Sequence, residues 1–370
     1  MSKAAELAKW GEVSTNGQVS GRRNIVINGA MNVAQRGTSS TGLGAAAGYF
    51  TLDRWRINTA NSAGRFTMTQ TADGPNGVSA NCTKLDCTTA DASIAAGELL
   101  MFQQPIEGQN LQAIGKGVAG AKQVTVSFYA KANAAKTYVC ALYDNDNARN
   151  ISKTFTVATD WTRHEITFDA DVDDGSSPFD DDNAVSLYLN IWLHAGTTYT
   201  GGTLATSWEN YTAANTAAGI DSFYSSTDNN FFITGVQLEV GSVATPFEHR
   251  SFGEELQLCN RYFTELNISS TDSFTHISTG IMGVYNSETQ GLLRYFFPVQ
   301  MRAVPTLSFD ALSSFDIEPF DVAPSAIASG SGTTKALTID VTDPSSRTKG
   351  FAFMLTIDTT TGYIRFDSEL

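Results

Sequence analysis

Alternation of polar and apolar side chains along short segments most strongly constrains what this sequence can fold into. Such segments follow one another between Asn24 and Arg250, with Gly, Asn, Asp or Pro at their ends and no amphipathic helix between them. Period-2 segments of this kind favour antiparallel sheets packed face to face over a parallel α/β sheet. The sequence therefore predicts an all-β fold. The clearest segments are residues 49–58, 65–71, 123–131, 138–143, 161–168 and 185–193.

Length and charge limit the organisation and the partners of the chain. Its 370 residues, 42% of them hydrophobic, are enough to form two cores, so two domains are expected. The formal net charge of -14 repels both phosphate backbones and anionic bilayers, so neither nucleic acid nor membrane is an expected partner. No stretch reaches the roughly 20 apolar residues of a membrane span.

The spacing of apolar residues changes after Arg250, from the alternation of strands to that of a helix. Residues 251–264 place apolar side chains on one helical face, with Ser251 as N-cap and Glu254 completing a capping box. A helix of about 14 residues is therefore predicted, with Phe252, Leu256, Cys259 and Phe263 along one face. Strands of a smaller domain are expected after it, at residues 279–285, 292–301, 336–341, 351–357 and 363–366.

The N-terminal residues are interpreted as a short docking arm. Residues 2–10 contain good helix formers with Leu7 and Trp10 among the apolar members, and a polar linker follows to residue 21. A frayed terminus is the alternative. No secretory signal is recognisable there, so synthesis in a cytoplasm is expected, where the four cysteines stay free thiols.

The stretch from His194 to Asn230 is the best candidate for ligand contact, because it is polar, long and rich in aromatic residues. Sugars present flat C–H faces to aromatic rings and hydroxyls to amides and carboxylates. The alternative is that the stretch covers a sheet edge or a neighbouring subunit. The candidate sugar-binding residues are Tyr199, Trp208, Glu209, Asn210 and Tyr211. By contrast, Trp55 is expected in the core between exposed Arg54 and Arg56.

Acidic residues gather between positions 169 and 182, where Asp171, Asp173 and Asp174 are weak candidates for a Ca²⁺ site. The stretch lacks the register of an EF-hand loop, and a solvated loop is the alternative. The four His residues are scattered without a neighbouring nucleophile signature, and no facing pair of carboxylates is identified. We therefore expect no catalysis and no obligatory cofactor.

Two motifs bracket the first domain: Asn-Ile-Val-Ile-Asn-Gly, which begins at Asn24, and Ile-Thr-Gly-Val-Gln-Leu-Glu-Val-Gly, which begins at Ile233 and is followed by Phe-Glu-His-Arg. They resemble the opening and closing strands of jelly-roll carbohydrate-binding modules in bacteriophage tail fibres and related virion proteins. Residues 258–263 and 292–306, which include Phe-Pro-Val-Gln-Met-Arg-Ala-Val-Pro-Thr, are similar to the distal part of many phage tail-fibre proteins. Calcium in such modules often lies beside the opening Asn-Gly, but Ala30 and Met31 follow that pair here.

The resemblance implies a domain organisation and a function. The expected parts are a virion-docking arm and linker (1–21), a jelly-roll β-sandwich (22–250), a connecting helix (251–265) and a distal small β domain (266–370). The implied protein is a virion structural protein of tail-fibre type that binds a host surface glycan, assembles as a homotrimer and contacts other virion proteins. A head fibre or capsid decoration protein is one alternative, and a polysaccharide-cleaving tailspike is another.

Overall fold

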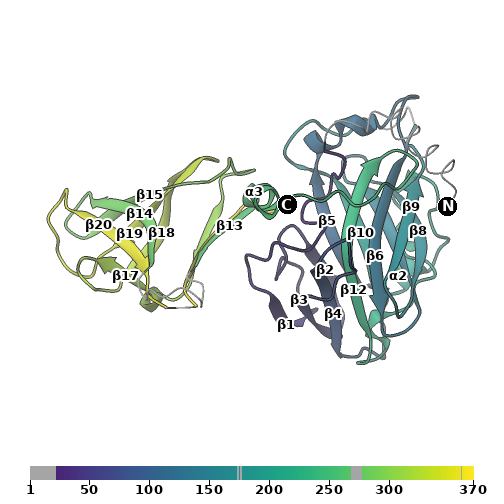
Figure 1. Cartoon of the computed structure of the whole chain (residues 1–370), viewed down its shortest axis with the longest axis horizontal. Coiled ribbons are helices and arrows are strands. Elements are labelled where there is room, and N and C mark those ends of the chain that lie inside the picture. Colours follow the sequence, from purple (N-terminus) through teal and green to yellow (C-terminus); the bar gives the residue numbers. More distant parts are fainter. Residues whose placement is uncertain (1–21, 173–174, 176, 268–276, 360) are drawn as a thin grey trace. The chain divides into compact units, whose positions relative to one another are not determined.

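A computed structural model describes residues 22–172, 175, 177–267, 277–359 and 361–370 (Figure 1). The expected arm at residues 1–21, with Leu7 and Trp10, lies outside the described residues, as do Asp173 and Asp174. The chain divides into two compact units, residues 1–255 with residue 370 and residues 256–369. Both units are built almost wholly from antiparallel strands, so the fold is all-β, as the sequence predicts.

The first unit is a jelly-roll β-sandwich of two six-stranded sheets. One sheet has the order β1-β3-β4-β12-β6-β9, with bounds Ser39–Leu43, Arg65–Thr71, Cys82–Thr89, Asn230–Val240, Val124–Ala132 and Thr162–Phe168. The other has the order β11-β8-β7-β10-β5-β2, with bounds Glu209–Asn210, Arg149–Val157, Lys136–Asp144, Val185–Ala195, Leu99–Glu107 and Arg56–Ala60. Short helical turns in the connections are η1 (Gly108–Asn110), η2 (Gln112–Ile114), α2 (Thr197–Thr200), η3 (Ala213–Asn215) and η4 (Phe223–Ser225).

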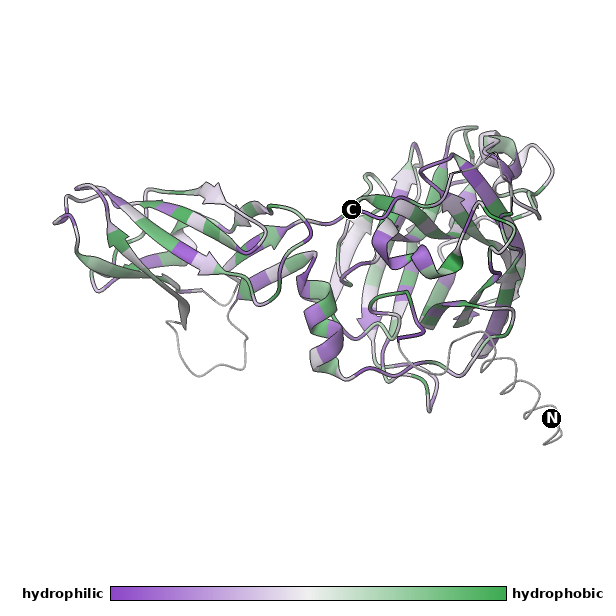
Figure 2. Cartoon of the chain, turned by 90° about the horizontal axis from the view of Figure 1, so that it is seen from above, coloured by the Kyte–Doolittle hydropathy of each residue, from purple (hydrophilic) through white to green (hydrophobic). Residues whose placement is uncertain are grey.

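The core of the sandwich follows from the alternation along the strands (Figure 2). In β10, Leu187, Leu189 and Ile191 point into the core, whereas the residues between them belong to the outer face of the sheet. Trp55 is fully buried and stacks on Phe102 with ring centroids 4.5 Å apart. The prediction of Trp55 as a core residue is confirmed. Arg54, which was expected to be exposed, is also buried, and its Nη2 donates to the Pro105 carbonyl.

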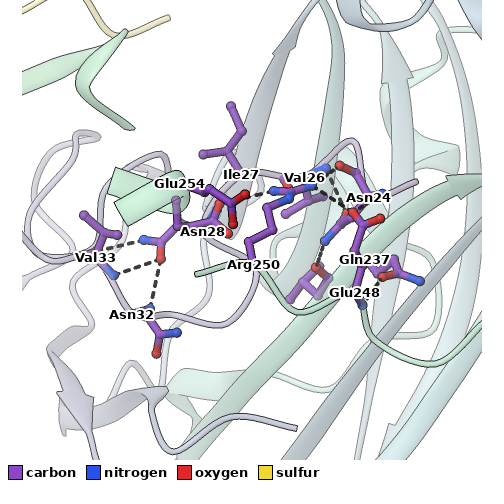
Figure 3. A network of polar contacts seen from close by, with 12 residues as sticks. Asn24, Val26, Ile27, Asn28, Asn32, Val33, Gln237, Glu248, Arg250 and Glu254 are labelled. Carbon is purple, nitrogen blue, oxygen red and sulfur yellow. Dashed lines mark hydrogen bonds and ion pairs between the residues drawn. The ribbon is translucent and has the colours of Figure 1, made fainter. Parts of the chain in front are cut away.

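The opening motif, which the resemblance predicts to be a strand, is held by side chains and forms no regular strand (Figure 3). Asn28 and Met31 adopt left-handed φ angles of 58° and 57°, which interrupt an extended ladder. Asn24 Oδ1 instead accepts from the Leu238 amide of β12, and its Nδ2 donates to the Val236 carbonyl.

Asn28 is the centre of this arrangement. Its Oδ1 accepts from the amides of Asn32 (2.9 Å) and Val33 (3.0 Å), and its Nδ2 donates to the carbonyls of Val33 (2.8 Å) and Asp53 (3.0 Å). At the closing end, Glu248 accepts from the amides of Arg23 and Asn24 at 3.0 Å each. The two bracketing motifs are therefore tied together through polar side chains.

Helix α3 (Phe252–Asn260) begins as predicted but ends earlier. The capping box is present, since Glu254 Oε2 accepts from the Ser251 amide at 2.9 Å and the Glu254 amide donates to Ser251 Oγ at 3.3 Å. Phe263, expected on the helix, starts strand β13 instead, and Phe252 is 59% exposed. The helix has nine residues because the chain turns at Tyr262 and then pairs with β21.

The second unit contains two sheets around a separate core. The smaller sheet has the order β13-β21-β16, with bounds Phe263–Asn267, Tyr363–Asp367 and Thr306–Phe309. The larger has the order β17-β20-β14-β15-β19-β18, with bounds Phe315–Glu318, Ala352–Ile357, Ile277–Tyr285, Gln290–Phe296, Ala336–Thr342 and Ala326–Gly332. The turn η5 spans Leu312–Ser314. β15 ends before Met301, where the expected strand extended, because Pro298 has no amide hydrogen for the ladder.

None of the helices in the described part of the chain is long and apolar enough to cross a membrane.

Candidate functional site

A cleft of about 360 Å³ lies on the outer face of the sheet β11-β8-β7-β10-β5-β2. Alternation along the strands decides which side chains reach it. Residues whose neighbours point into the sandwich core themselves point outward, so Asn190 and Trp192 of β10 line the cleft between core residues Leu189, Ile191 and Leu193.

Strand register places three polar side chains in one row across the floor of the cleft. Gln103 of β5 is paired with Arg56 of β2 on one side and with Asn190 of β10 on the other. Gln103 Nε2 donates to Asn190 Oδ1 at 2.7 Å, and Arg56 Nη1 donates to Gln103 Oε1 at 3.5 Å. No described protein group accepts from the Asn190 amide nitrogen, so its hydrogens remain available to a ligand. The row thus presents fixed donors on a rigid sheet.

Aromatic side chains surround this polar row. Tyr188 of β10 is paired with Tyr143 of β7, with ring centroids 6.1 Å apart and an angle of 32° between the rings. Tyr211 meets Tyr143 edge to face at 5.2 Å, and Tyr199 meets Trp192 at 5.4 Å. Tyr211 is 41% exposed, so part of its ring is open to a ligand. These are the surfaces on which the C–H face of a sugar packs.

The connection at residues 196–220 forms a wall of the cleft and covers part of the outer face beside it. Beneath it, Leu99, Met101, Val139 and Trp192 form a small apolar cluster, separate from the main core, against which Tyr199 packs. The connection is closed on itself by backbone hydrogen bonds, including Ala217 amide to Tyr199 carbonyl at 3.0 Å. The two functions considered for this segment, covering the sheet and contacting a ligand, are therefore compatible.

The phenols of Tyr143, Tyr188 and Tyr211 are uncharged at neutral pH. Burial raises the pKa of Tyr143, Tyr188 and Tyr211 above the ordinary value of 10, and a neighbouring Tyr raises it further in Tyr143 and Tyr211. Arg56 lowers the pKa of Tyr188 in part. The hydroxyls can therefore both donate and accept hydrogen bonds.

Among the residues proposed from the sequence, Tyr199 and Tyr211 line the cleft, whereas the other three do not. Trp208 is half-buried against the sandwich core, and its Nε1 donates to the Asp169 carbonyl at 2.7 Å. Glu209 Oε1 accepts from Asn215 Nδ2 at 2.9 Å, and Asn210 Oδ1 accepts from Arg149 at 3.2 Å. These three side chains hold the connection in place.

Sequence reasoning missed the residues of the cleft floor. A signal was present, since Tyr188, Asn190 and Trp192 stand two apart in residues 185–193 and must share one face. Arg56 was expected to be exposed, but it is half-buried beside Gln103. The polar row could not be predicted because it depends on the register between strands distant in sequence.

Asp171, the described member of the candidate calcium set, is engaged by cations of the protein. Both of its oxygens accept from Arg149, at 2.9 and 3.0 Å, and Lys116 Nζ lies 3.8 Å from one of them. Lys116 also pairs with Asp144 at 2.7 Å. Within the described ranges, no group of three or more His, Cys, Asp or Glu side chains is arranged to hold a metal ion. Asp171 thus serves in a buried ion-pair network.

No protein-family model matches the chain, and no curated protein matches its sequence. Solved structures similar to it include the enzymatically active domain of tailspike protein 4 of bacteriophage CBA120, at 14% identity and a TM-score of 0.30 over 59% of this chain. A CBM4 structure matches at 13% identity and a TM-score of 0.29, with 58% of this chain and 97% of that chain covered. A family 61 carbohydrate-binding module in complex with β-1,4-galactotriose matches at 9% identity and a TM-score of 0.29, with 59% and 99% covered. The match spans only 21% of the tailspike chain. At such identities and TM-scores these likenesses carry no argument about function.

Proposed function

We propose that this chain is a virion structural protein of tail-fibre type that adsorbs to a host surface glycan without cleaving it. The observation that carries the proposal is the cleft, in which Tyr143, Tyr188 and Tyr211 stand around the polar row Arg56–Gln103–Asn190. Aromatic rings offer the stacking surface and the amides offer the directional hydrogen bonds that sugar recognition needs.

The composition of the lining supports binding rather than hydrolysis. Glycoside hydrolysis ordinarily requires two carboxyl groups facing one another across the scissile bond. The lining of the cleft contains amides, phenols and one guanidinium, and none of its residues is Asp or Glu. Such a surface holds a sugar without supplying a general acid.

The virion role rests on the resemblance of the bracketing and distal motifs to phage fibre proteins. A homotrimer presents three clefts, so weak single-site binding gains avidity on a repetitive host surface. Residues 1–21 are assigned to attachment, on either the tail or the capsid, and the expected location is the particle surface after synthesis in the host cytoplasm.

The test uses the two tyrosines that contact a ligand in this proposal. Tyr188→Ala and Tyr211→Ala are each expected to lower affinity for purified host surface polysaccharide about fivefold or more, because each removes a stacking surface worth about 1 kcal/mol or more. Binding is measured by glycan microarray and calorimetry, with circular dichroism to check that the melting temperature is kept.

Tyr129→Ala is the matched control, since Tyr129 is a half-buried tyrosine on β6 of the other sheet and should leave binding unchanged. Full binding by the Tyr188→Ala/Tyr211→Ala double variant would refute the cleft as the site.

A further inference from the structure

The cleft is lined by positive charge and no negative charge. Arg56 is its only charged lining residue, although the whole chain carries a formal net charge of -14. The carboxylate electrostatically coupled to Tyr143 is that of Asp144, which is buried and already paired with Lys116 at 2.7 Å. A ligand in the cleft therefore meets a local positive charge on an acidic protein.

Arg56 has no carboxylate partner among the described residues. Its one hydrogen bond is the 3.5 Å contact to the neutral Gln103 side chain. Two other arginines are neutralised by carboxylates, Arg149 by Asp171 at 2.9 Å and Arg347 by Asp343 at 2.8 Å. A half-buried guanidinium beside Tyr188 retains most of its charge-assisted hydrogen-bonding capacity.

The geometry of the row directs this capacity toward a bound sugar. Gln103 is fixed between Asn190 and Arg56, so the guanidinium is held at the end of the row. A planar guanidinium matches a carboxylate through two parallel N–H donors, and one such group balances one singly charged acid. Nearby phenols and aromatic rings reduce access of water and strengthen the pairing.

We propose that the cleft selects an acidic glycan, a polysaccharide bearing uronic acid carboxylates, and that Arg56 is the residue that determines this specificity. This inference rests on the glycan-binding function proposed above. Arg56 pairs with the carboxylate, while the tyrosines pack against the sugar rings.

The experiment compares matched ligands on the full chain. The probes are hexasaccharides of galacturonate, glucuronate and mannuronate, the same oligosaccharides after reduction of their carboxyl groups to alcohols, and a set of neutral hexoses. Calorimetry measures the dissociation constant of each probe for the wild type, Arg56→Gln, Arg56→Lys and the control Arg294→Gln. Arg294 lies exposed on β15 of the second unit, where it donates to Thr338, so its replacement makes the same charge change at a residue that does not line the cleft.

We expect at least one uronate to bind the wild type at least tenfold more tightly than its carboxyl-reduced form, the usual effect of a charge-assisted hydrogen bond. Arg56→Gln should abolish the difference, Arg56→Lys should keep part of it, and Arg294→Gln should keep all of it. Raising ionic strength should weaken uronate binding only.

Equal binding of acidic and reduced probes, or an unchanged preference in Arg56→Gln, overturns the specificity while leaving glycan binding intact. Binding of neutral hexoses alone does the same. Failure of every probe to bind the wild type would instead refute the proposed glycan binding itself. Melting temperatures of the Arg56 variants exclude loss of the fold as the cause.

Discussion

Replacing Asn28 by Ala should severely destabilise the first unit. The fully buried Asn28 side chain makes four hydrogen bonds, to the amides of Asn32 and Val33 and to the carbonyls of Val33 and Asp53. At about 1 kcal/mol each, their loss costs about 4 kcal/mol. Ala also tolerates the φ of 58° less well than Asn, which adds about 1 kcal/mol. The expected loss of unfolding free energy is therefore about 5 kcal/mol.

Tryptophan fluorescence isolates the affected unit. All five Trp residues of the sequence precede residue 256, so the signal reports on the first unit alone. Trp55 is a direct reporter, because its Nε1 donates to the Asn28 carbonyl at 3.0 Å. With a urea dependence of about 2–3 kcal/mol per molar, the midpoint of unfolding should fall by about 2 M.

Two variants separate the causes. Asn28→Gly loses the same four hydrogen bonds but accepts the left-handed φ, so the difference from Ala isolates the backbone contribution. Asn32→Ala is the control, since the half-buried Asn32 side chain makes one hydrogen bond among the described residues, accepted from Asn81, and its loss should cost less than about 1 kcal/mol. A shift below about 0.5 M for Asn28→Ala would show that the polar network does not hold the opening motif.

Four further outcomes are expected. Trp208→Ala should lower stability by about 2–3 kcal/mol in circular dichroism, somewhat below the cost for a fully buried Trp, while glycan affinity of the folded protein is kept; lost affinity at full stability would contradict its packing role. Burial opposes ionisation of Glu248, but hydrogen bonds from the Arg23 and Asn24 amides and the charge of Arg250 hold its pKa below the ordinary 4.5. The ionised carboxylate therefore stabilises the fold above pH 4.5, and this contribution is lost as the pH falls through the lowered pKa. Glu248→Gln should flatten the acid side of a plot of urea midpoint against pH, and an unchanged plot would argue against this role. Deletion of residues 1–21 should leave a folded protein that no longer enters particles, and an unfolded product would place the arm in the core. Sedimentation should give three times 39.7 kDa, and a monomer at micromolar concentration would count against the homotrimer.

The strands predicted from the sequence are those in which polar side chains on one face alternate with apolar side chains on the other. Period-2 alternation identified β10 and β6 because polar residues alternate with core residues along most of both strands, as Ser186, Tyr188 and Asn190 do in β10. β5 was missed, since all nine of its residues are buried and no alternation remains visible in Leu-Leu-Met-Phe-Gln-Gln-Pro-Ile-Glu. Its outer face is covered by the connection at residues 196–220, which local sequence cannot reveal.

For the candidate site, the sequence indicated which segment contributes side chains to the cleft, but it did not indicate all the residues that line it. Tyr199 and Tyr211 of the aromatic, polar connection line the cleft, whereas their role in sugar binding stays a prediction. Trp208 could not be assigned from the sequence, since its direction depends on the hydrogen bond to the Asp169 carbonyl. Arg56 and Gln103 meet only through the pairing of β2 with β5, which is a tertiary property.

The sheet β11-β8-β7-β10-β5-β2 has apolar side chains on both faces: the main core on the inner face and the small cluster beneath residues 196–220 on the outer face. Substitutions at Tyr199 or Tyr211 alter the outer layer, whereas the inner layer against Leu189 and Ile191 is unaffected. Tyr211 is 41% exposed, and substitutions at exposed positions usually change stability little, so this part of the outer layer can vary at small cost to folding. Substitutions at Tyr199 and Tyr211 would then be a route by which the proposed ligand specificity of the cleft changes while the core of the sandwich is kept.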